Sequence, residues 1–276
     1  MCRVLNVSRS GYYDSLKGAV SSRAREKERL LRMIREEHRK SKQRYGAPRI
    51  SQALRAREVQ VSRPRVARLM KQAGIKAKTA RKFRATTDSK HGFEVSANLL
   101  KRDFWPATIG QAWVSDITYI RTLAGWLYLT VVLDLADRKV IGWALSETMC
   151  ASQTSVAALK MAVRNRPVSQ GLVFHSDRGV QYACDEFRKA LGAHPLVRQS
   201  MSRRANCWDN AVAESFFKSL KSECVYGARF EDRQAAALTI FEYIEVFYNR
   251  ERLHSSLGYR TPIQMEKKLN TKPIAA

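Results

Sequence analysis

The chain has few cysteines and no long apolar runs, and both absences exclude classes of protein. Its five cysteines are odd in number and form no CxxC pair, which argues against a disulfide framework and a structural zinc site. No apolar run approaches the roughly 20 residues that a membrane helix needs, and the first ten residues lack the apolar segment of a signal peptide. We therefore expect a protein of the reducing cytosol with no membrane partner.

Acidic residues are scarce as well: 25 Asp and Glu face 50 Lys and Arg, giving a net charge of +25. Residues 1–104 hold 28 basic and 9 acidic residues, whereas residues 105–276 hold 22 and 16. This uneven excess predicts a polyanion-binding surface in the first third of the chain. A ribosomal-type or merely soluble basic protein would carry the same charge, but it would not need the acids described below.

The spacing of apolar residues in the first third of the chain predicts helices. Residues 22–41 form one charged helix with a narrow apolar stripe, which suits a solvated strut slightly better than a helix lying on DNA. Two shorter helices follow: Pro48 fits the first turn of one, Ser62 can cap the next, and Gly74 can end it.

The second of these short helices leaves Arg65, Arg68 and Lys71 outside its apolar face. The pair resembles a helix-turn-helix, and we favour DNA contact through these three residues. Any small helical pair with a solvated basic face would look the same. Residues 76–104 are basic without periodicity and are expected to be a linker.

From Gln111 onward the pattern alternates strands and helices. Three β-rich segments joined by short turns predict antiparallel strands, at 112–120, 125–134 and 139–145. Helices are then expected at 152–165, 183–192, 209–224 and 231–248, and strands at 171–177 and 196–199. This order is that of an α/β, ribonuclease-H-like fold: a mixed five-stranded sheet with flanking helices, preceded here by a small helical helix-turn-helix domain.

Three acids stand in distinctive settings. Asp116 lies inside a strand, where Asp is disfavoured and costly to bury, although a hydrogen bond to Thr118 would explain it. Asp177 ends an apolar strand, where sites form in α/β sheets, but Asp is also a common turn residue. Glu214 lies in the first turns of a helix, a surface position that the helix dipole favours.

Together these carboxylates could hold a metal, because hard Mg²⁺ or Mn²⁺ prefers oxygen ligands. Two such ions roughly 3.5–4 Å apart activate an attacking oxygen and stabilise a leaving one. Lys218 and Lys221 follow Glu214 on the same helix face and suit a phosphate clamp, though a salt-bridged helix surface would look similar. In a basic chain this combination predicts the cutting or joining of nucleic acid strands.

Other titratable residues compete for the same role: Asp134, Asp185, Asp209, Glu223 and His175. Asp209 is expected to cap the helix that carries Glu214, and Glu223 falls off the Glu214 face. Asp185 begins a helix. Asp134 ends the second strand and is the hardest to dismiss. His175 is interpreted as a buried structural histidine rather than a base.

Seven motifs follow one another over nearly the whole chain. They are VSRSGYY (7–13), YGAPRI (45–50), WVSDITYI (113–120), HSDRGVQY (175–182), SMSRRANCWDNA (200–211), ESFFKSLK (214–221) and YNRERLHSSLGYRTP (248–262). In these motifs the chain resembles the integrase-core DDE transposases of bacterial insertion sequences. More narrowly, it resembles the protein encoded by the second reading frame of two-frame elements.

The resemblance implies a retroviral-integrase-like catalytic core in which Asp116, Asp177 and Glu214 hold two Mg²⁺ ions, for which Mn²⁺ can substitute. It also implies that Lys221 contacts DNA near the active site. The expected activity is cleavage at an element end and transfer of the freed 3′-hydroxyl to another phosphodiester. The expected partners are duplex DNA (terminal repeats and target), further copies of this chain, and the first-reading-frame protein or a fusion with it, in the bacterial cytosol near the nucleoid.

Further DNA contacts are expected around the core. Residues expected to flank the substrate strand are Arg178, Gln181 and Tyr182, and those expected to contact bases or phosphates are Arg204, Asn206 and Asn210. Arg252 and His254 look similarly placed, but helix packing explains them equally well. We expect a basic helical arm (1–44), a helix-turn-helix-like domain with its linker (45–104), the catalytic core (105–226) and a helical tail (227–276).

Two other functions stay open from the sequence. One is a DNA-binding regulator with an inactive core, against which the presence of all three acids counts. The other is a ribonuclease-H-like nuclease acting on RNA hybrids, against which the helix-turn-helix and the basic arm count.

Overall fold

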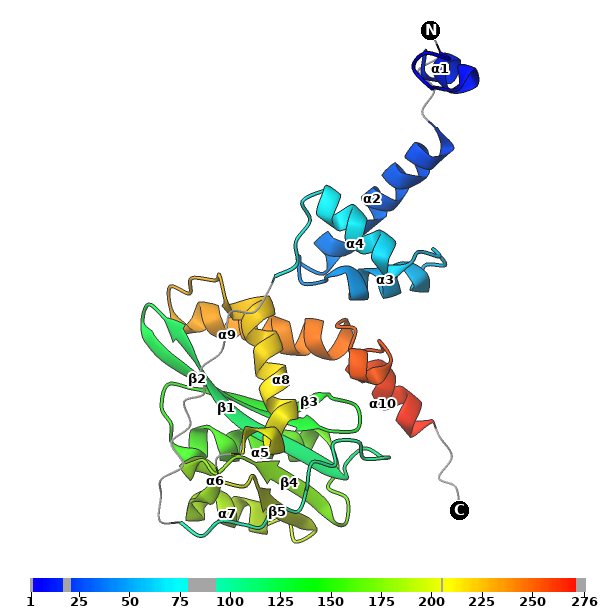
Figure 1. Ribbon diagram of the computed structural model, residues 1–276. Helices are drawn as coiled ribbons and strands as arrows, with labels where there is room; N and C mark the ends of the chain where they lie inside the picture. Colours follow the sequence, from blue (N-terminus) through cyan, green and yellow to red (C-terminus); the bar gives the residue numbers. More distant parts are fainter. Residues whose placement is uncertain (1, 17–20, 79–92, 205, 272–276) are drawn as a thin grey trace. The chain divides into compact units, whose positions relative to one another are not determined.

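The computed structural model describes residues 2–16, 21–78, 93–204 and 206–271, so residues 79–92 of the predicted linker lie outside the described residues. The chain divides into two compact units, residues 1–78 and 79–276 (Figure 1). The helices of the first unit are α1 (Arg9–Leu16), α2 (Ser22–Lys40), α3 (Ala47–Ala56) and α4 (Arg63–Gln72). Within the described part of the chain, no helix is long and apolar enough to span a membrane.

The long helix α2 packs on α3 and α4 rather than standing in solvent. Its Leu30 and Ile34 are buried, as are Leu54 of α3 and Val66 of α4. The strut interpretation is therefore wrong, because the narrow apolar stripe of α2 completes the core of the helical unit. The predicted ends of α4 are confirmed: Ser62 Oγ accepts from the backbone N–H of Arg65 at 3.4 Å, and Gly74 follows the helix with φ +66°.

The second unit is built on the predicted mixed sheet of five strands. They are β1 (Ala112–Thr122), β2 (Gly125–Asp134), β3 (Val140–Ser146), β4 (Leu172–Ser176) and β5 (Val197–Met201). Their order in the sheet is β3-β2-β1-β4-β5. The first three pair antiparallel, while β4 is parallel to β1 and β5 is parallel to β4. The sheet order and strand directions confirm the predicted α/β architecture.

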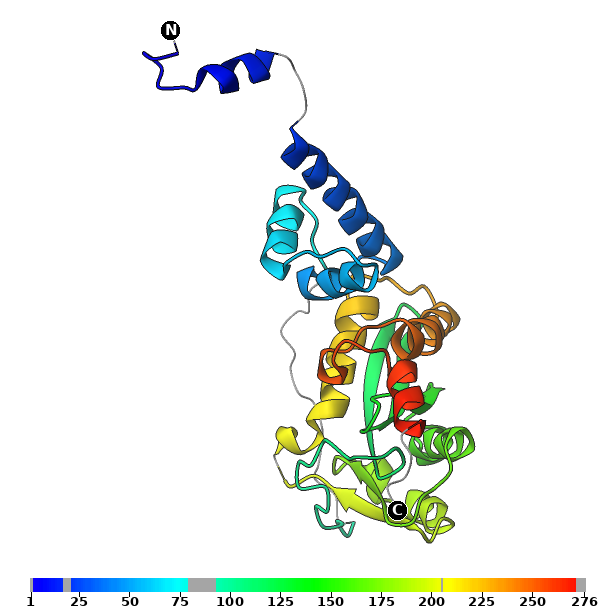
Figure 2. The same cartoon turned by 90° about the vertical axis from the view of Figure 1, so that its right-hand side faces the viewer.

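Helices cover both faces of this sheet. Their bounds are η1 (Ala151–Gln153), α5 (Ser155–Asn165), α6 (Val180–Ala183), α7 (Asp185–Gly192), η2 (Cys207–Asn210), α8 (Ala211–Leu220), η3 (Lys221–Val225), α9 (Arg233–Phe241), η4 (Glu242–Tyr248), η5 (Ser255–Leu257) and α10 (Pro262–Asn270). Helices α5 and α7 lie on one face and α8 on the other, as Figures 1 and 2 show together. The element η4 packs on α8, where the rings of Tyr248 and Phe216 lie 4.8 Å apart.

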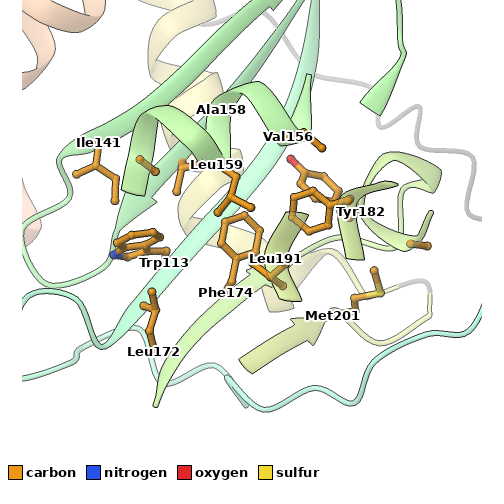
Figure 3. Packing of buried hydrophobic residues seen from close by; sticks show 14 residues of the cluster. Trp113, Ile141, Val156, Ala158, Leu159, Leu172, Phe174, Tyr182, Leu191 and Met201 are labelled. Atoms are coloured by element: carbon orange, nitrogen blue, oxygen red, sulfur yellow. The ribbon is translucent and has the colours of Figure 1, made fainter. Parts of the chain in front are cut away.

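The main core fills the space between the sheet and α5, α6 and α7 (Figure 3). Phe174 of β4, Tyr182 of α6 and Phe187 of α7 are all fully buried. The Tyr182 and Phe187 rings meet edge to face at 5.3 Å, an arrangement that aromatic quadrupoles favour. This cluster fixes the position of β4, and with it the residue that follows the strand.

Gly142 of β3 allows α5 to approach the sheet closely. A Cβ added there would lie 2.7 Å from the Ala162 backbone nitrogen and 2.8 Å from the Ala162 Cβ. We expect Gly142→Ala to lower the free energy of unfolding by about 1–3 kcal/mol, because backbone must move to accept the methyl group. Urea unfolding followed by circular dichroism measures the change.

Gly192→Ala is the matched control, because no atom lies within 4 Å of a Cβ built at Gly192. Gly192 ends α7 and needs no positive φ, so its substitution should leave stability unchanged or raise it slightly. Equal effects of the two substitutions would contradict the close packing of β3 on α5.

Candidate active site

The parallel pairing of β1 with β4 brings two of the predicted acids together. Ser115 of β1 is in register with Ser176 of β4, so the residues that follow, Asp116 and Asp177, come next to each other at this edge. Side chains alternate along a strand. Ser115 faces the α6 layer, where its Oγ contacts the Tyr182 hydroxyl at 2.7 Å, so Asp116 faces the side of the sheet that α8 covers.

Helix α8 is tied to β1 beside Asp116. The side-chain Nδ2 of Asn210 donates to the backbone carbonyl of Ser115 at 3.1 Å, and α8 packs against β1 along this stretch. Glu214 lies four residues after Asn210, one turn farther along the same helix face. This hydrogen bond, which the sequence did not reveal, ties the start of the Glu214 helix to the residue before Asp116.

The three carboxylates act on one another electrostatically. Burial, the charge of Asp177 and the charge of Glu214 raise the pKa of Asp116 well above its ordinary value, while the Ile117 N–H and Lys221 oppose the rise. Burial and the charge of Asp177 also raise the pKa of Glu214. Like charges gathered in a partly desolvated place repel one another, and such crowding is relieved by a proton or a cation.

The donor set fits a hard divalent cation, since all of its atoms are carboxylate oxygens. Asp116 and Asp177 each use Oδ1 to accept a backbone N–H, from Ile117 at 2.8 Å and from Gly179 at 2.9 Å. These bonds hold the two carboxylates in fixed orientations. Asp116 thus accepts a hydrogen bond from the backbone of Ile117, where the sequence had suggested a hydrogen bond with Thr118.

The three carboxylates do not form a closed set of ligands in the structure. Across residues 2–16, 21–78, 93–204 and 206–271, no three His, Cys, Asp or Glu side chains are grouped so that they could hold a metal ion. Glu214 is exposed, so its side chain is not fixed by packing. The residues therefore fit a divalent ion in the chemistry of their donor atoms.

The two predicted lysines differ in environment. Lys221 begins η3, is buried, and places its Nζ 5.1 Å from the centroid of the Tyr119 ring. Burial lowers the pKa of Lys221, and the nearby charge of Asp116 opposes that change. Lys218 lies one turn beyond Glu214 on α8 and is exposed. The buried ammonium group of Lys221 is near the acids and can neutralise a phosphate oxygen there. The ammonium group of Lys218 lies at the protein surface, in solvent.

Two of the predicted DNA contacts are wrong. Tyr182 is fully buried and its hydroxyl contacts Ser115, and Asn210 is 3% exposed with its amide on the Ser115 carbonyl. Neither side chain can reach a DNA strand. Both instead contact Ser115, the residue before Asp116: Tyr182 contacts its hydroxyl and Asn210 its backbone carbonyl. The motif spacing alone gave no sign of this role.

The other predicted contacts in this region lie at or near the surface. Arg204 is exposed. Arg178 is half-buried, with its Nε donating to the Ser202 carbonyl at 2.7 Å. Gln181 is half-buried, and Asn206 Oδ1 accepts from the backbone N–H of Trp208 at 3.2 Å. These four side chains stay candidates for DNA contact.

Asp209 does not cap α8, contrary to expectation. Helix α8 has no side-chain cap, and Asn206 caps the short η2 turn before it. The buried carboxylate of Asp209 accepts from Arg203 Nε at 2.9 Å, Arg102 Nε at 2.9 Å and Asn98 Nδ2 at 2.9 Å. Arg203 is the main cause that holds the pKa of Asp209 well below its ordinary value. Asp209 thus joins the segment from Asn98 to Arg102 to the loop that precedes α8.

The remaining acids that competed with the three are structural or remote. Asp134 is fully buried and contacts Arg166 Nη1 at 2.7 Å. Glu223 is buried against Arg252 Nη2 at 2.7 Å, so helix packing is the correct interpretation of that arginine. Asp185 is exposed in the first turn of α7.

His175 has the structural role expected of it. It is fully buried, with Nδ1 2.8 Å from Ser200 Oγ and Nε2 3.2 Å from Ser202 Oγ. Burial lowers the pKa of His175 to about 4. Its ring is therefore neutral near pH 7 and engaged at both nitrogens.

In the helical unit, the outward face of α4 is basic as predicted. Arg68 and Lys71 are exposed. Arg65 is half-buried and its Nη2 contacts Glu26 of α2 at 2.9 Å. Arg65 therefore has an intramolecular partner that Arg68 and Lys71 do not share.

Known families match in three places. Residues 107–207 match the integrase core domain, residues 214–269 match a second integrase core domain family, and residues 25–83 match an HTH-like domain. The helix-turn-helix prediction is confirmed by the last of these, and the ribonuclease-H-like core by the first. The fold and the site therefore define an integrase-core polynucleotidyl transferase.

Curated relatives cover almost the whole chain. It is 43% identical over 270 residues to the transposase InsF for insertion sequence IS3A of Escherichia coli (strain K12), covering 97% of this chain and 93% of the relative. It is 41% identical over 268 residues to the insertion element IS600 uncharacterized 31 kDa protein of Shigella sonnei, covering 97% and 98%. The chain belongs to the integrase-core transposases of insertion sequences. Its activity is DNA strand cleavage and transfer in transposition, and it depends on a divalent metal.

Solved structures show weaker similarity. The simian T-cell lymphotropic virus intasome in complex with PP2A regulatory subunit B56 gamma matches at 14% identity and a TM-score of 0.49, over 88% of this chain and 76% of that chain. The catalytic core domain of BIV integrase matches at 15% identity and a TM-score of 0.43, over 58% and 96%.

The contrast between Asp209 and Asp116 gives a stability test. We expect Asp209→Asn to lower the free energy of unfolding by about 2–3 kcal/mol at pH 7, because charged hydrogen bonds are lost in a buried place. The contribution of Asp209 is present above its ordinary pKa of 3.8 and declines as the pH falls toward its lower folded pKa. Asp116→Asn should instead raise the free energy of unfolding by about 1 kcal/mol in metal-free buffer, because it removes a repelled anion.

Urea unfolding of both variants in the presence of EDTA measures the two changes. Both variants remove one carboxylate charge and keep the size of the side chain, so each controls for the other. A destabilisation of similar size in both would show that Asp116 is a structural carboxylate like Asp209.

Proposed function

We propose that Asp116, Asp177 and Glu214 are the catalytic carboxylates of this transposase and that they hold two Mg²⁺ ions, for which Mn²⁺ can substitute. The supporting observation is geometric: the register of β1 and β4 sets Asp116 beside Asp177, and the start of the Glu214 helix is bonded to Ser115. Burial, and then the charges of Asp177 and Glu214, raise the pKa of Asp116. When bound, such ions activate the attacking oxygen and stabilise the leaving oxygen of a phosphodiester. No covalent intermediate with the protein is needed.

The chain's own residues would orient this reaction. Asp116 and Asp177 are held by backbone N–H groups, whereas the exposed Glu214 closes toward them. Lys221 neutralises a non-bridging phosphate oxygen. Water attacks the phosphorus at an element end, breaks the bond to the 3′ oxygen and frees a 3′-hydroxyl. That hydroxyl then attacks a second phosphodiester, which joins the strands and releases a new 3′-hydroxyl.

DNA would be held by exposed or half-buried cations and amides of both units. In the helical unit these are Arg68 and Lys71, with Arg65 available when its contact with Glu26 opens. Around the acids they are Arg178, Gln181, Arg204, Asn206 and Lys218. Phosphate contacts of this kind fix the register of the protein on DNA, while amide and guanidinium groups can also reach base edges.

The assembly is proposed to contain more than one copy of the chain, because two element ends must be brought together for joining. The first-reading-frame protein, or a fusion with it, is the proposed source of specific recognition of the terminal repeats. Action on bacterial DNA would place the complex in the cytosol.

The carboxylate assignment predicts a loss of chemistry without a loss of binding. Asp116→Asn, Asp177→Asn and Glu214→Gln should each lower metal-dependent cleavage of DNA bearing the element ends at least about a hundredfold, because several kcal/mol of transition-state stabilisation is lost. Gel analysis of labelled DNA, with the first-frame protein present, measures the rate.

Asp185→Asn is the control, since it removes an exposed acid outside the three. Its cleavage rate should match that of the unaltered protein. If any of the three variants kept full metal-dependent cleavage, the assignment would fail. If the unaltered protein bound DNA without cutting it, an inactive regulator would be the better description.

The basic face of α4 predicts a salt-dependent contribution to binding. Arg68→Gln and Lys71→Gln should each weaken DNA binding and reduce the slope of log K against log salt by about 0.9. The reason is that each variant makes one fewer phosphate contact and so displaces one fewer counterion from the DNA. Fluorescence anisotropy between roughly 50 and 200 mM salt measures the slope. Arg57→Gln is the control, because Arg57 is already paired with Glu36 and Glu37. Unchanged slopes for Arg68 and Lys71 would argue against DNA contact by α4.

A further inference from the structure

Trp208 is the most exposed tryptophan of the core unit, with 69% of its surface accessible. It lies in η2, immediately before α8, the helix that carries Glu214. Leaving an indole in water forgoes a large gain from apolar burial. The side chain is thus available for a partner that the chain itself does not supply.

Other exposed tryptophans have ring partners. The Arg138 guanidinium carbon lies 4.8 Å from the centroid of the Trp105 ring, and Tyr119 meets the Trp126 ring edge to face at 5.1 Å. Among the residues that the structure describes, the Trp208 ring has no aromatic or cationic partner of this kind. Trp208 is therefore about as exposed as Trp105 but lacks the ring partner that Trp105 has.

The backbone holds Trp208 firmly despite this exposure. Its N–H donates to Asn206 Oδ1 at 3.2 Å. The next residue, Asp209, is buried and accepts from Arg203 and Arg102. Asn210 is bonded to the carbonyl of Ser115, the residue before Asp116. The indole is thus presented from a fixed turn, two residues from a direct link to the acidic site.

The charge around Trp208 favours a polyanion. Arg203 and Arg204 are exposed in the preceding loop, and the one acid of the turn, Asp209, is buried and neutralised by arginines. A flat apolar ring among cations suits a ligand with a flat π-face on a phosphate backbone. A nucleobase of a DNA strand has both features, and base–aromatic stacking accepts any base.

We propose that Trp208 stacks on an unpaired base of the DNA strand next to the phosphate that the three acids act on. This role rests on the proposed function of those acids and adds a positioning residue to it. The stacked base would hold the strand in register, so that the phosphate stays in place while Glu214 closes.

A binding experiment tests the stacking without requiring any cleavage. Forked DNA with a 2-aminopurine at each unpaired position in turn is titrated with the protein in EDTA. Stacking on Trp208 should quench the 2-aminopurine at one position. Trp208→Leu should abolish that quenching and weaken binding roughly tenfold or more, while Trp208→Tyr keeps most of both. Trp105→Leu, the matched exposed tryptophan, should change neither.

Equal affinity and equal quenching for the unaltered protein and Trp208→Leu would overturn the proposal. So would a Trp208→Tyr variant as defective as Trp208→Leu, because only an aromatic ring should rescue stacking. The melting temperatures of the two Trp208 variants should be unchanged, since the exposed indole contributes little to the core.

An abasic series extends the test to the reaction. Removing the stacked base should lower the cleavage rate of the unaltered protein. It should not lower the cleavage rate of Trp208→Leu any further, because the substitution and the missing base remove the same contact. Additive effects would overturn the proposal. If quenching follows Trp208 while no metal-dependent cleavage occurs even with the first-frame protein, the proposed catalytic function fails and the stacking stands.

Discussion

Electrostatic repulsion among carboxylates is the constraint on which the site depends. The parallel register of β1 and β4 places Asp116 beside Asp177, and the tie between Asn210 and Ser115 brings the Glu214 helix to the same edge. Holding these charges near one another costs free energy. The strand residues next to the acids are packed on the buried aromatic cluster, where Tyr182 contacts Ser115 and meets Phe187 edge to face.

Elsewhere in the core, buried acids are neutralised by arginine. Asp134 contacts Arg166, and Glu223 contacts Arg252. Asp116 instead has two further acids and one lysine within electrostatic reach. Asp116 therefore differs from the other buried carboxylates, because its charge is not neutralised by an arginine, and a divalent cation is the kind of ligand that carboxylate oxygens favour.

Much of the fold followed from local pattern. β-rich segments, apolar runs and short turns predicted all five strands. Asp116 stood out because it lies inside a strand, and Asp177 stood out because it ends an apolar one. The roles of Tyr182, Asn210 and Asp209 could not be predicted this way. Each depends on a contact with a residue distant in sequence, such as Ser115 for Asn210 and Arg102 for Asp209. In a chain that acts on DNA, a polar residue in a sequence motif fits a DNA contact as well as it fits a contact inside the protein.

The most direct test of the account is a titration of Mn²⁺ followed by electron paramagnetic resonance, on the unaltered protein and on Glu214→Gln. Free Mn²⁺ gives a signal that is lost on binding, so the number and affinity of bound ions are measured without any reaction. The account predicts that the unaltered protein binds Mn²⁺ at the three acids and that Glu214→Gln binds it more weakly or in smaller number. Identical titrations for the two proteins would contradict a shared metal site of Asp116, Asp177 and Glu214.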